Sequence, residues 1–408
     1  MKRKRQLLPL EDRGPLRVMF LLSSMPVGGA ETLLVNLTRR LDKSRFTPLL
    51  CCLQSLGPLG EELARELPAY SGLIHGKYDL LVLPRLVRLL KRERVDAVVT
   101  VGAGDKMFWG RIAARLAGIP VICSAIHSTG WPDVIERPNR SRLLTHWTDA
   151  FIAVAEEHGR HLVDVEGFPA DRVHVIPNGI DVQRFTACGE SGMTRKTLGI
   201  ATEAPLVGIV AALRPEKDHG MFLRTAALVC EKIPAARFLI IGDGPERPAL
   251  ERLSRDLNLQ DAVQFLGNRA DIPKLLSALD VFVLTSQMEA SPVSIMEAMA
   301  CGKPVVAPRV GSIDESVIDG VTGYLVEPGS SVLAAQRILG LLENPALAQR
   351  LGQAGRERVC DRSSLEAMVA GYEQLLSTIY ESKVRPPVSR RTAHAGTAQV
   401  PLSAGGVP

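Results

Sequence analysis

The stretch that decides the fold reads Asp280-Val-Phe-Val-Leu-Thr-Ser-Gln-Met-Glu289-Ala-Ser-Pro-Val-Ser-Ile-Met-Glu297-Ala-Met-Ala-Cys-Gly-Lys-Pro-Val-Val306. It begins as a short apolar run typical of a buried strand, and it continues with a helical pattern that ends at Gly302-Lys-Pro304. Glu289 lies on the loop and Glu297 in the helix. Two carboxylates at such a junction can bind hydroxyl groups at two ends of one polyol, while the helix N-terminus between them attracts an anion.

Similar units recur along the 408 residues. Apolar and β-branched runs predict strands at 17–23, 46–53, 95–101, 121–126, 151–155 and 173–176, and in the second half at 205–213, 237–241, 263–266, 281–284, 304–307 and 323–326. Helical spacing lies between them, including residues 31–41, 221–232, 247–257 and 331–342. We therefore expect two doubly wound α/β domains that face each other across a cleft, each with its own core.

Composition indicates the domain limits. We predict a basic extension at 1–16, a first domain at 17–185, a hinge in the small, polar segment 186–204, a second domain at 205–362, a helix returning to the first domain at 363–382, and a disordered tail at 383–408.

Charge and cysteine content exclude several classes of protein. The formal net charge is +5, but Lys2–Arg5 and the tail lysine and arginines at 383, 385, 390 and 391 supply eight positive charges, so the rest of the chain carries about −3. Basic ends of this kind are usually solvated, and the pattern does not fit a nucleic-acid binder. The seven cysteines are scattered, and no apolar run is long enough to span a membrane, so a cytoplasmic protein is expected.

Glycine-rich loops follow several predicted strands. Gly28 and Gly29 join the first strand to the first helix, and Gly242 and Gly244 follow the strand at 237–241. Glycines there let a backbone approach a phosphate, although simple flexible turns have the same composition. No acidic residue ends the next strand to bind a ribose, so an NAD site is weakly supported.

Taken with the sequence Ala-Met-Ala-Cys-Gly-Lys-Pro-Val-Val that follows Glu297, the two glutamates resemble the donor-site signature of family 4 retaining glycosyltransferases. The resemblance covers roughly residues 17 to 375. It implies the GT-B fold and a nucleotide-diphosphate sugar, UDP- or GDP-linked, as donor, with no cofactor. Glu297 would bind the ribose and Glu289 the transferred sugar. Gly28, Gly29, Gly242 and Gly244 would lie around the donor phosphates.

The resemblance also assigns other loops. His127, at a strand end where an ordinary polar histidine is common, would lie beside the transferred sugar. Asn268 and Arg269 would lie against the base, and the amides of Ser291 and Val293 would serve the donor because Pro292 has no N–H. Lys217 would bind the pyrophosphate. The family's usual arginine position is taken by Ala212, and Arg214, two residues later, is the candidate replacement.

The function expected is therefore a retaining glycosyltransferase acting on a glycan, lipid-linked or small-molecule acceptor. A sugar-nucleotide epimerase, a phosphorylase of the same architecture, or a non-catalytic glycan-binding subunit are the alternatives. No metal is expected, because the chain contains no Asp-x-Asp and because His158-x-x-His161 lacks a third ligand and fits a solvated helix face better.

The segment Pro84–Arg94 leaves two interpretations open. As a helix it has Arg85, Arg88, Lys91 and Arg92 on one side and Leu86, Val87, Leu89 and Leu90 mostly on the other. Such a helix either packs its leucines on the sheet as an ordinary crossover helix or lies on an anionic bilayer. The second case predicts peripheral contact with the inner face of the cell membrane.

Overall fold

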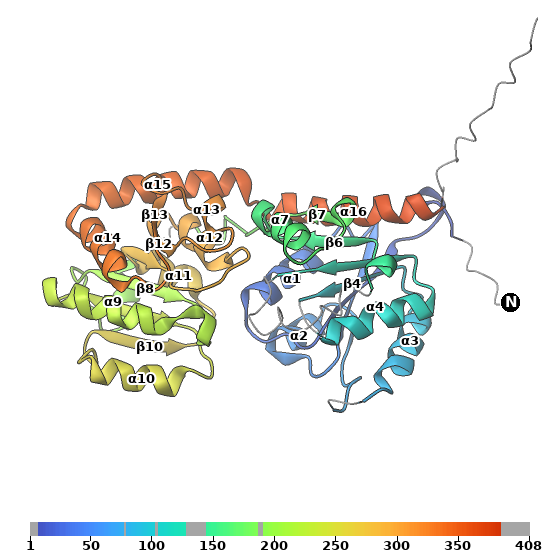
Figure 1. The fold of residues 1–408 in the computed structure, drawn as a ribbon, viewed down its shortest axis with the longest axis horizontal. Coiled ribbons are helices and arrows are strands. Elements are labelled where there is room, and N and C mark those ends of the chain that lie inside the picture. Colours follow the sequence, from blue (N-terminus) through green and yellow to red (C-terminus); the bar gives the residue numbers. More distant parts are fainter. Residues whose placement is uncertain (1–6, 77–78, 103–104, 128–143, 187–190, 385–408) are drawn as a thin grey trace, which may run out of the picture.

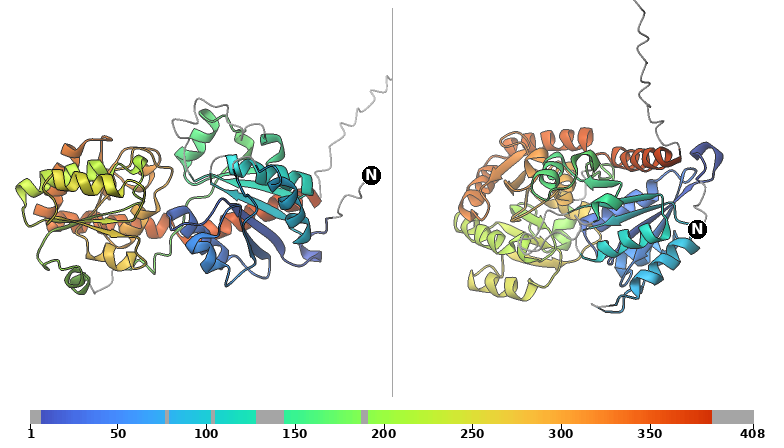
Figure 2. Two further views of the ribbon diagram at one scale, coloured as in Figure 1. Left: turned by 90° about the horizontal axis from the view of Figure 1, so that it is seen from below. Right: turned by 45° about the vertical axis from the view of Figure 1, so that its right-hand side comes forward.

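The structure is a computed structural model that describes residues 7–76, 79–102, 105–127, 144–186 and 191–384, with only the backbone of 105–107. It forms two α/β lobes joined along one side by long C-terminal helices (Figure 1). Both views in Figure 2 show helices covering the sheets. The predicted fold class is confirmed.

In the first domain, the described strands form a parallel sheet of order β3-β2-β1-β4-β5-β6-β7. The strands are β1 (Leu16–Leu22), β2 (Phe46–Cys52), β3 (Ala69–Tyr70), β4 (Ala97–Val101), β5 (Val121–Ala125), β6 (Ala150–Ala153) and β7 (Val173–Val175). The helices are α1 (Gly29–Arg40), α2 (Gly57–Leu63), α3 (Val82–Arg92), α4 (Asp105–Ala117) and α7 (Glu156–Asp164), with short 3-10 turns at Leu10–Asp12, Thr145–Trp147 and Ala170–Arg172.

In the second domain, the described strands form a parallel sheet of order β10-β9-β8-β11-β12-β13. The strands are β8 (Leu206–Val210), β9 (Arg237–Ile241), β10 (Val263–Gly267), β11 (Val281–Val283), β12 (Val305–Pro308) and β13 (Gly323–Val326). The helices are α8 (Ser191–Thr197), α9 (His219–Lys232), α10 (Arg247–Asp256), α11 (Ile272–Ala278), α12 (Val293–Ala300), α13 (Ile313–Ser316), α14 (Ser331–Glu343) and α15 (Pro345–Arg362), followed by α16 (Leu365–Val384). A 3-10 turn, Pro215–Lys217, follows β8.

The central strands are buried on both faces, as expected where helices cover both sides of a parallel sheet. This explains why their sequences are continuous apolar runs rather than alternating ones. The predicted strands match the observed ones to within a few residues. The short edge strand β3 was not predicted, because two residues carry too little pattern to be distinguished from a loop.

The chain crosses between the domains earlier than predicted. Ile176 belongs to the core of the first domain, whereas Ile180 and Phe185 already pack in the core of the second. The return crossing runs beside the first, since the Ile180 amide donates to the carbonyl of Ser363 over 2.9 Å. Within the predicted hinge at 186–204, α8 packs on the second domain through Arg195, which donates to the carbonyl of Ala278.

The last helix returns to the first domain, as predicted. One side of α16, from Leu365 to Tyr380, packs in the core of that domain, whereas α15 lies along the second (Figure 1). Lys383, predicted to begin a disordered tail, is instead the penultimate residue of α16 and pairs with Asp149 over 2.5 Å. The predicted tail beyond it and Lys2–Arg5 lie outside the described residues.

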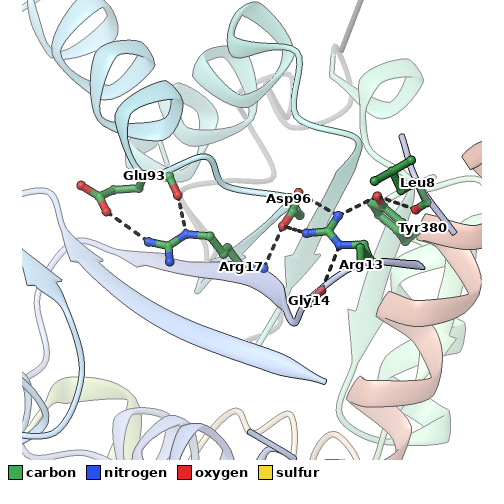
Figure 3. Close-up of polar contacts among 7 residues, drawn as sticks. All are labelled: Leu8, Arg13, Gly14, Arg17, Glu93, Asp96 and Tyr380. Atoms are coloured by element: carbon green, nitrogen blue, oxygen red, sulfur yellow. Dashed lines mark hydrogen bonds and ion pairs between the residues drawn. The ribbon is translucent and has the colours of Figure 1, made fainter. Parts of the chain in front are cut away.

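Part of the predicted N-terminal extension is built into the fold. Figure 3 shows Arg13 between Asp96, at the start of β4, and Tyr380 of α16. Its guanidinium donates two hydrogen bonds to the buried Asp96 carboxylate, at 2.6 and 3.2 Å, and one to the Tyr380 hydroxyl at 2.6 Å. The Tyr380 hydroxyl in turn donates to the carbonyl of Leu8. This network fastens the far end of α16 to the first domain.

The apolar face of α3 packs in the core of the first domain. Leu86, Leu89 and Leu90 are buried in a core with β1 and β2, as expected of an ordinary crossover helix. Arg85 pairs with Asp79 over 2.6 Å, while Arg88 and Arg92 stay exposed. The leucines therefore cannot also enter a bilayer. Within the described residues, no helix combines the length and hydropathy needed to cross a membrane.

Candidate active site

Loops from neighbouring strands of the second sheet meet at one edge. Because β10, β9, β8 and β11 are adjacent and parallel, their carboxyl ends lie together. A Cβ atom at Gly242 or Gly244 would overlap the backbone carbonyl of Ala211 or Leu213, in the loop after β8. Gly242 also has a φ of 138°, which side chains rarely allow. These glycines let the loops after β8 and β9 stack backbone to backbone.

The centre of this edge is an ion pair between two of the predicted catalytic residues. Lys217 Nζ lies 2.5 Å from Glu289 Oε1, and the Ser286 hydroxyl donates to the same oxygen at 2.7 Å. Glu289 is only 9% exposed, so the pair is held largely away from water. A buried carboxylate needs such partners to remain ionised. The structure thus brings together two residues separated by 72 positions in the chain.

The backbone around Lys217 is fixed by its neighbours. The Thr285 hydroxyl donates to the Lys217 carbonyl at 2.9 Å. Asp218 has a left-handed backbone, with φ 42° and ψ 54°, and its carboxylate accepts from the Met221 amide to cap α9. A non-glycine residue in this region is strained and persists only where the surroundings enforce it. The cap and the Thr285 hydrogen bond fix the backbone on both sides of the Lys217 carbonyl.

The segment after β12 packs directly against the loop that carries Glu289. The Ser312 hydroxyl donates to the carbonyl of Ala290. Gly311 has a φ of 53°, and a Cβ atom there would overlap the Glu289 carbonyl. The polypeptide at Gly311 and Ser312 therefore packs directly against the backbone of the catalytic loop.

Glu297 has a different environment. It lies in α12 between the buried residues Met296 and Ala298. Burial raises its pKa to about 7, and only the charge of Arg184 acts in the opposite direction. At neutral pH this carboxyl is poised between its two protonation states.

Helix α1 of the first domain meets α12 of the second domain. Gly29 begins α1, and a Cβ atom there would be 3.3 Å from the side chain of Val293, which begins α12. Asn178, in the crossing segment, donates to the carbonyl of Ser291 at 3.2 Å. The predicted residues Gly28, Gly29, Ser291 and Val293 are thus brought together at two converging helix N-termini, a favourable place for an anion.

Arg214, the predicted replacement for the missing arginine, is exposed on the loop after β8. Its charge reaches Glu31 in the first turn of α1: burial raises the pKa of Glu31, and Arg214 opposes that rise. The charge of Arg214, on the second domain, therefore acts on a residue of the first domain.

His127 follows β5 in the first domain and lines a small cavity with Ala30 of α1 and Met368 and Tyr372 of α16. Burial lowers its pKa to about 4, so it is neutral at physiological pH. A neutral imidazole can both donate and accept a hydrogen bond.

Asn268 and Arg269 follow β10. The amide of Gly242 donates to the carbonyl of Gly267 at 2.9 Å, which ties this loop to the one after β9. Asn268 is exposed, and Arg269 pairs with its neighbour Asp271 over 2.7 Å. The Arg269 side chain is therefore paired within its own loop, whereas that of Asn268 has no polar partner among the described residues.

Some residues of the site were not predicted. Thr285 and Ser286 are hydroxyl residues directly after a buried strand, which is a signal that the sequence does carry. Asp218 and Asn178 act through backbone geometry and contacts between domains, which the sequence does not display. His158 was expected on a solvated face, but it is buried, and its Nδ1 accepts from the Val154 amide at 3.2 Å. Within the described ranges, His, Cys, Asp and Glu side chains form no group of three that could bind a metal.

Comparison with known proteins agrees with this arrangement. Residues 27–184 match the family described as Glycosyltransferase Family 4, and residues 192–358 match Glycosyl transferases group 1. The chain is 32% identical over 318 residues to EpsF of Bacillus subtilis (strain 168), whose glycosyltransferase name is provisional; the match covers 75% of this chain and 82% of EpsF. It is 30% identical over 304 residues to the Escherichia coli UDP-Gal:alpha-D-GlcNAc-diphosphoundecaprenol alpha-1,3-galactosyltransferase, covering 70% of this chain and 78% of that enzyme.

Among solved structures, the Anabaena protein Alr3699/HepE in complex with UDP-glucose matches with a TM-score of 0.79 and 25% identity, over 89% of this chain and 100% of HepE. WaaG, a glycosyltransferase involved in lipopolysaccharide biosynthesis, has the same fold, with a TM-score of 0.71 over 88% of this chain and 99% of WaaG, at 16% identity. The chain therefore belongs to the family 4 glycosyltransferases and has their two-domain GT-B fold.

Proposed function

We propose that this glycosyltransferase transfers a sugar from a nucleotide-diphosphate sugar, in the first instance a UDP-sugar, with retention of anomeric configuration and without a metal ion. The observation that carries the proposal is the Lys217–Glu289 pair, held at 2.5 Å beside the N-terminus of α12. The UDP-glucose complex of HepE and the UDP-Gal named for the Escherichia coli relative support the uridine nucleotide; a GDP-sugar is the alternative.

Each residue has a proposed role at the donor. The Glu297 carboxylate accepts from the ribose hydroxyls, and Glu289 accepts from hydroxyls of the transferred sugar. Lys217 and the amides at the starts of α1 and α12 bind the pyrophosphate, with Arg214 as a second cation. Ammonium Nζ has three donors, so Lys217 can bind Glu289 and a phosphate oxygen at once.

The proposed reaction breaks the bond between the anomeric carbon and the β-phosphate oxygen, and negative charge grows on that oxygen. A fixed cation and oriented amides stabilise this charge. The acceptor hydroxyl attacks from the side the phosphate leaves, and its proton passes to the departing phosphate oxygen. A carboxylate that already accepts from Lys217 and Ser286 is a poor nucleophile, so Glu289 serves binding instead. His127 contacts the transferred sugar from the first domain.

Lys217 supplies the positive charge that a divalent ion would otherwise supply, and the sequence contains no Asp-x-Asp to hold such an ion. The decisive experiment incubates the protein with labelled UDP- and GDP-sugars and lipid-linked acceptors, with and without EDTA. NMR of the product gives its anomeric configuration. Transfer with retention in EDTA supports the proposal; inversion, or activity that requires added manganese, contradicts it. Epimerised donor without transfer would assign the protein to another class.

We further propose a lipid-linked acceptor and peripheral contact with an anionic membrane at the inner face of the cell membrane. The support is local: Leu80 and Leu81, just before α3, are 69% and 62% exposed, and the same helix carries the exposed basic residues Arg88 and Arg92. Exposed apolar residues next to cations are suited to an anionic bilayer. Co-sedimentation with anionic liposomes that is lost in Leu80→Glu/Leu81→Glu would support it, and no binding at low salt would reject it.

A further inference from the structure

One contact joins the two domains through residues that lie outside both crossing segments. Glu315, in the short helix α13 of the second domain, accepts hydrogen bonds from the amides that begin α7 of the first domain. Its carboxylate oxygens lie 2.6 Å from the Glu157 amide and 3.1 Å from the Glu156 amide. Charge-assisted bonds of this kind are stronger than neutral ones.

The Glu315 carboxylate caps the N-terminus of α7. This helix begins after Ala155, which has no side-chain oxygen, and it has no capping side chain of its own. Its first turn also carries two acidic side chains, but Glu157 is paired with Arg160 over 2.5 Å. The free amides at a helix N-terminus favour an anion. The second domain thus supplies the cap that the first domain lacks.

The second domain holds Glu315 firmly in place. Arg358 of α15 donates two hydrogen bonds to the Glu315 carbonyl, at 2.6 and 3.2 Å. Arg358 precedes the return crossing by only a few residues. Movement of one domain against the other must therefore either break the cap on α7 or carry Glu315 with it.

The segment that carries Glu315 also contacts the loop that carries Glu289. Gly311 packs on the backbone of Glu289, and the Ser312 hydroxyl donates to the carbonyl of Ala290. Four positions separate Gly311 from Glu315, so the contact with the first domain and the support of the catalytic loop lie on one short stretch of chain.

We propose that Glu315 is a positioning residue that stabilises the closed arrangement of the two domains and links it to the placement of Glu289. The proposal rests on the proposed function, in which His127 of the first domain contacts the sugar of a donor held mainly by the second domain. Most of the proposed nucleotide contacts lie on the second domain, so UDP binding should depend little on the Glu315 contact. Sugar transfer needs both domains in register and should depend on it.

The test compares Glu315→Ala with Asp314→Ala, a matched removal of the neighbouring exposed acid. We expect Glu315→Ala to lower kcat at least tenfold and to increase the radius of gyration measured by small-angle X-ray scattering, while the Kd for UDP changes less than twofold. Asp314→Ala should leave all three unchanged. Glu315→Gln should recover part of kcat, because its amide oxygen can still accept from one of the two amides.

A substitution in the other domain tests the same contact. Glu156→Pro removes one donating amide at the first position of α7, where proline is tolerated, and the preceding Ala155 is already extended. We expect a loss of kcat in the same direction and, combined with Glu315→Ala, little further loss. Ser312→Ala should lower kcat without changing the radius of gyration, because it breaks the link to Ala290 and leaves the α7 contact.

Equal kcat in Glu315→Ala and Asp314→Ala would overturn the proposal. So would a loss of UDP affinity as large as the loss of kcat, since that would mean a damaged second domain. If the unaltered protein transfers no sugar, the proposed function fails, and scattering still decides the domain contact: an unchanged radius of gyration in Glu315→Ala overturns it.

Discussion

Replacing Glu297 by Gln should stabilise this protein in a pH-dependent way. Burial raises the pKa of Glu297 from 4.5 to about 7, so the folded state binds a proton more tightly than the unfolded state does. The stability of the protein then falls as pH rises from 4.5 to 7, and the full penalty is present above pH 7. A difference of about 2.5 pKa units corresponds to about 3 kcal/mol at pH 8 and less than about 1 kcal/mol at pH 5. Glutamine has nearly the same shape and avoids this penalty.

Differential scanning calorimetry of the unliganded protein at both pH values measures the effect. For a domain of this size, about 3 kcal/mol corresponds to a rise of roughly 6–12 °C in the Tm of the second domain. Glu289→Gln is the matched control: it breaks the 2.5 Å pair with Lys217, so it should not stabilise at either pH. A Tm equal to that of the unaltered protein at pH 8, or the same increase at pH 5 and pH 8, would refute the raised pKa of Glu297.

The remaining predictions concern binding, catalysis and the backbone. If the ionised form of Glu297 binds the ribose, the Kd for a UDP-sugar measured by calorimetry should rise about tenfold from pH 8 to pH 6, and Glu297→Gln should remove this dependence. Lys217→Ala should lower kcat at least about a hundredfold, equally with and without EDTA; manganese rescue of the unaltered enzyme after EDTA would contradict this. Gly311→Ala should abolish transfer and lower the Tm, because its Cβ overlaps the Glu289 carbonyl, whereas Gly329→Ala, with a similar positive φ but open space, should keep activity.

The parts of the site that follow from strand order could be predicted from sequence. Glu289 and Lys217 each follow a buried strand, and the carboxyl ends of parallel strands lie on one edge, so their meeting is a consequence of topology. Their partner Ser286 lies three residues before Glu289 and could have been predicted from the same strand order. The role proposed for Arg214 came only from the family resemblance. The structure adds that the charge of Arg214 acts on Glu31.

Contacts between the domains could not be predicted. The Glu315 carboxylate and the Glu157 amide are 158 positions apart and meet only through the relative placement of two separate cores. The hinge was placed too late for a related reason: the small, polar composition of 186–204 also fits an exposed helix, and α8 is held to the second domain by the long side chain of Arg195. The helix α3 shows the same ambiguity, because an apolar face suits a core or a bilayer equally well until the packing is known.

The contrast between the two glutamates explains why one site can use them differently. In the proposed complex a diphosphate would bring negative charge next to Glu289, and the ion pair with Lys217 would offset the repulsion. Glu297 has no such partner at close range and is therefore kept partly protonated at neutral pH by burial. In the proposed donor complex the ribose hydroxyls would stabilise its ionised form, so part of the ribose binding energy would be used to charge it. Glu289 is already paired with Lys217 before a donor arrives and would orient the sugar without that cost. In this proposal the preformed Lys217–Glu289 pair lies at the reacting end of the donor, and Glu297, whose charge can change, lies at the nucleotide end. Such an arrangement is expected if only the groups near the reacting atoms must be preorganised for the transition state.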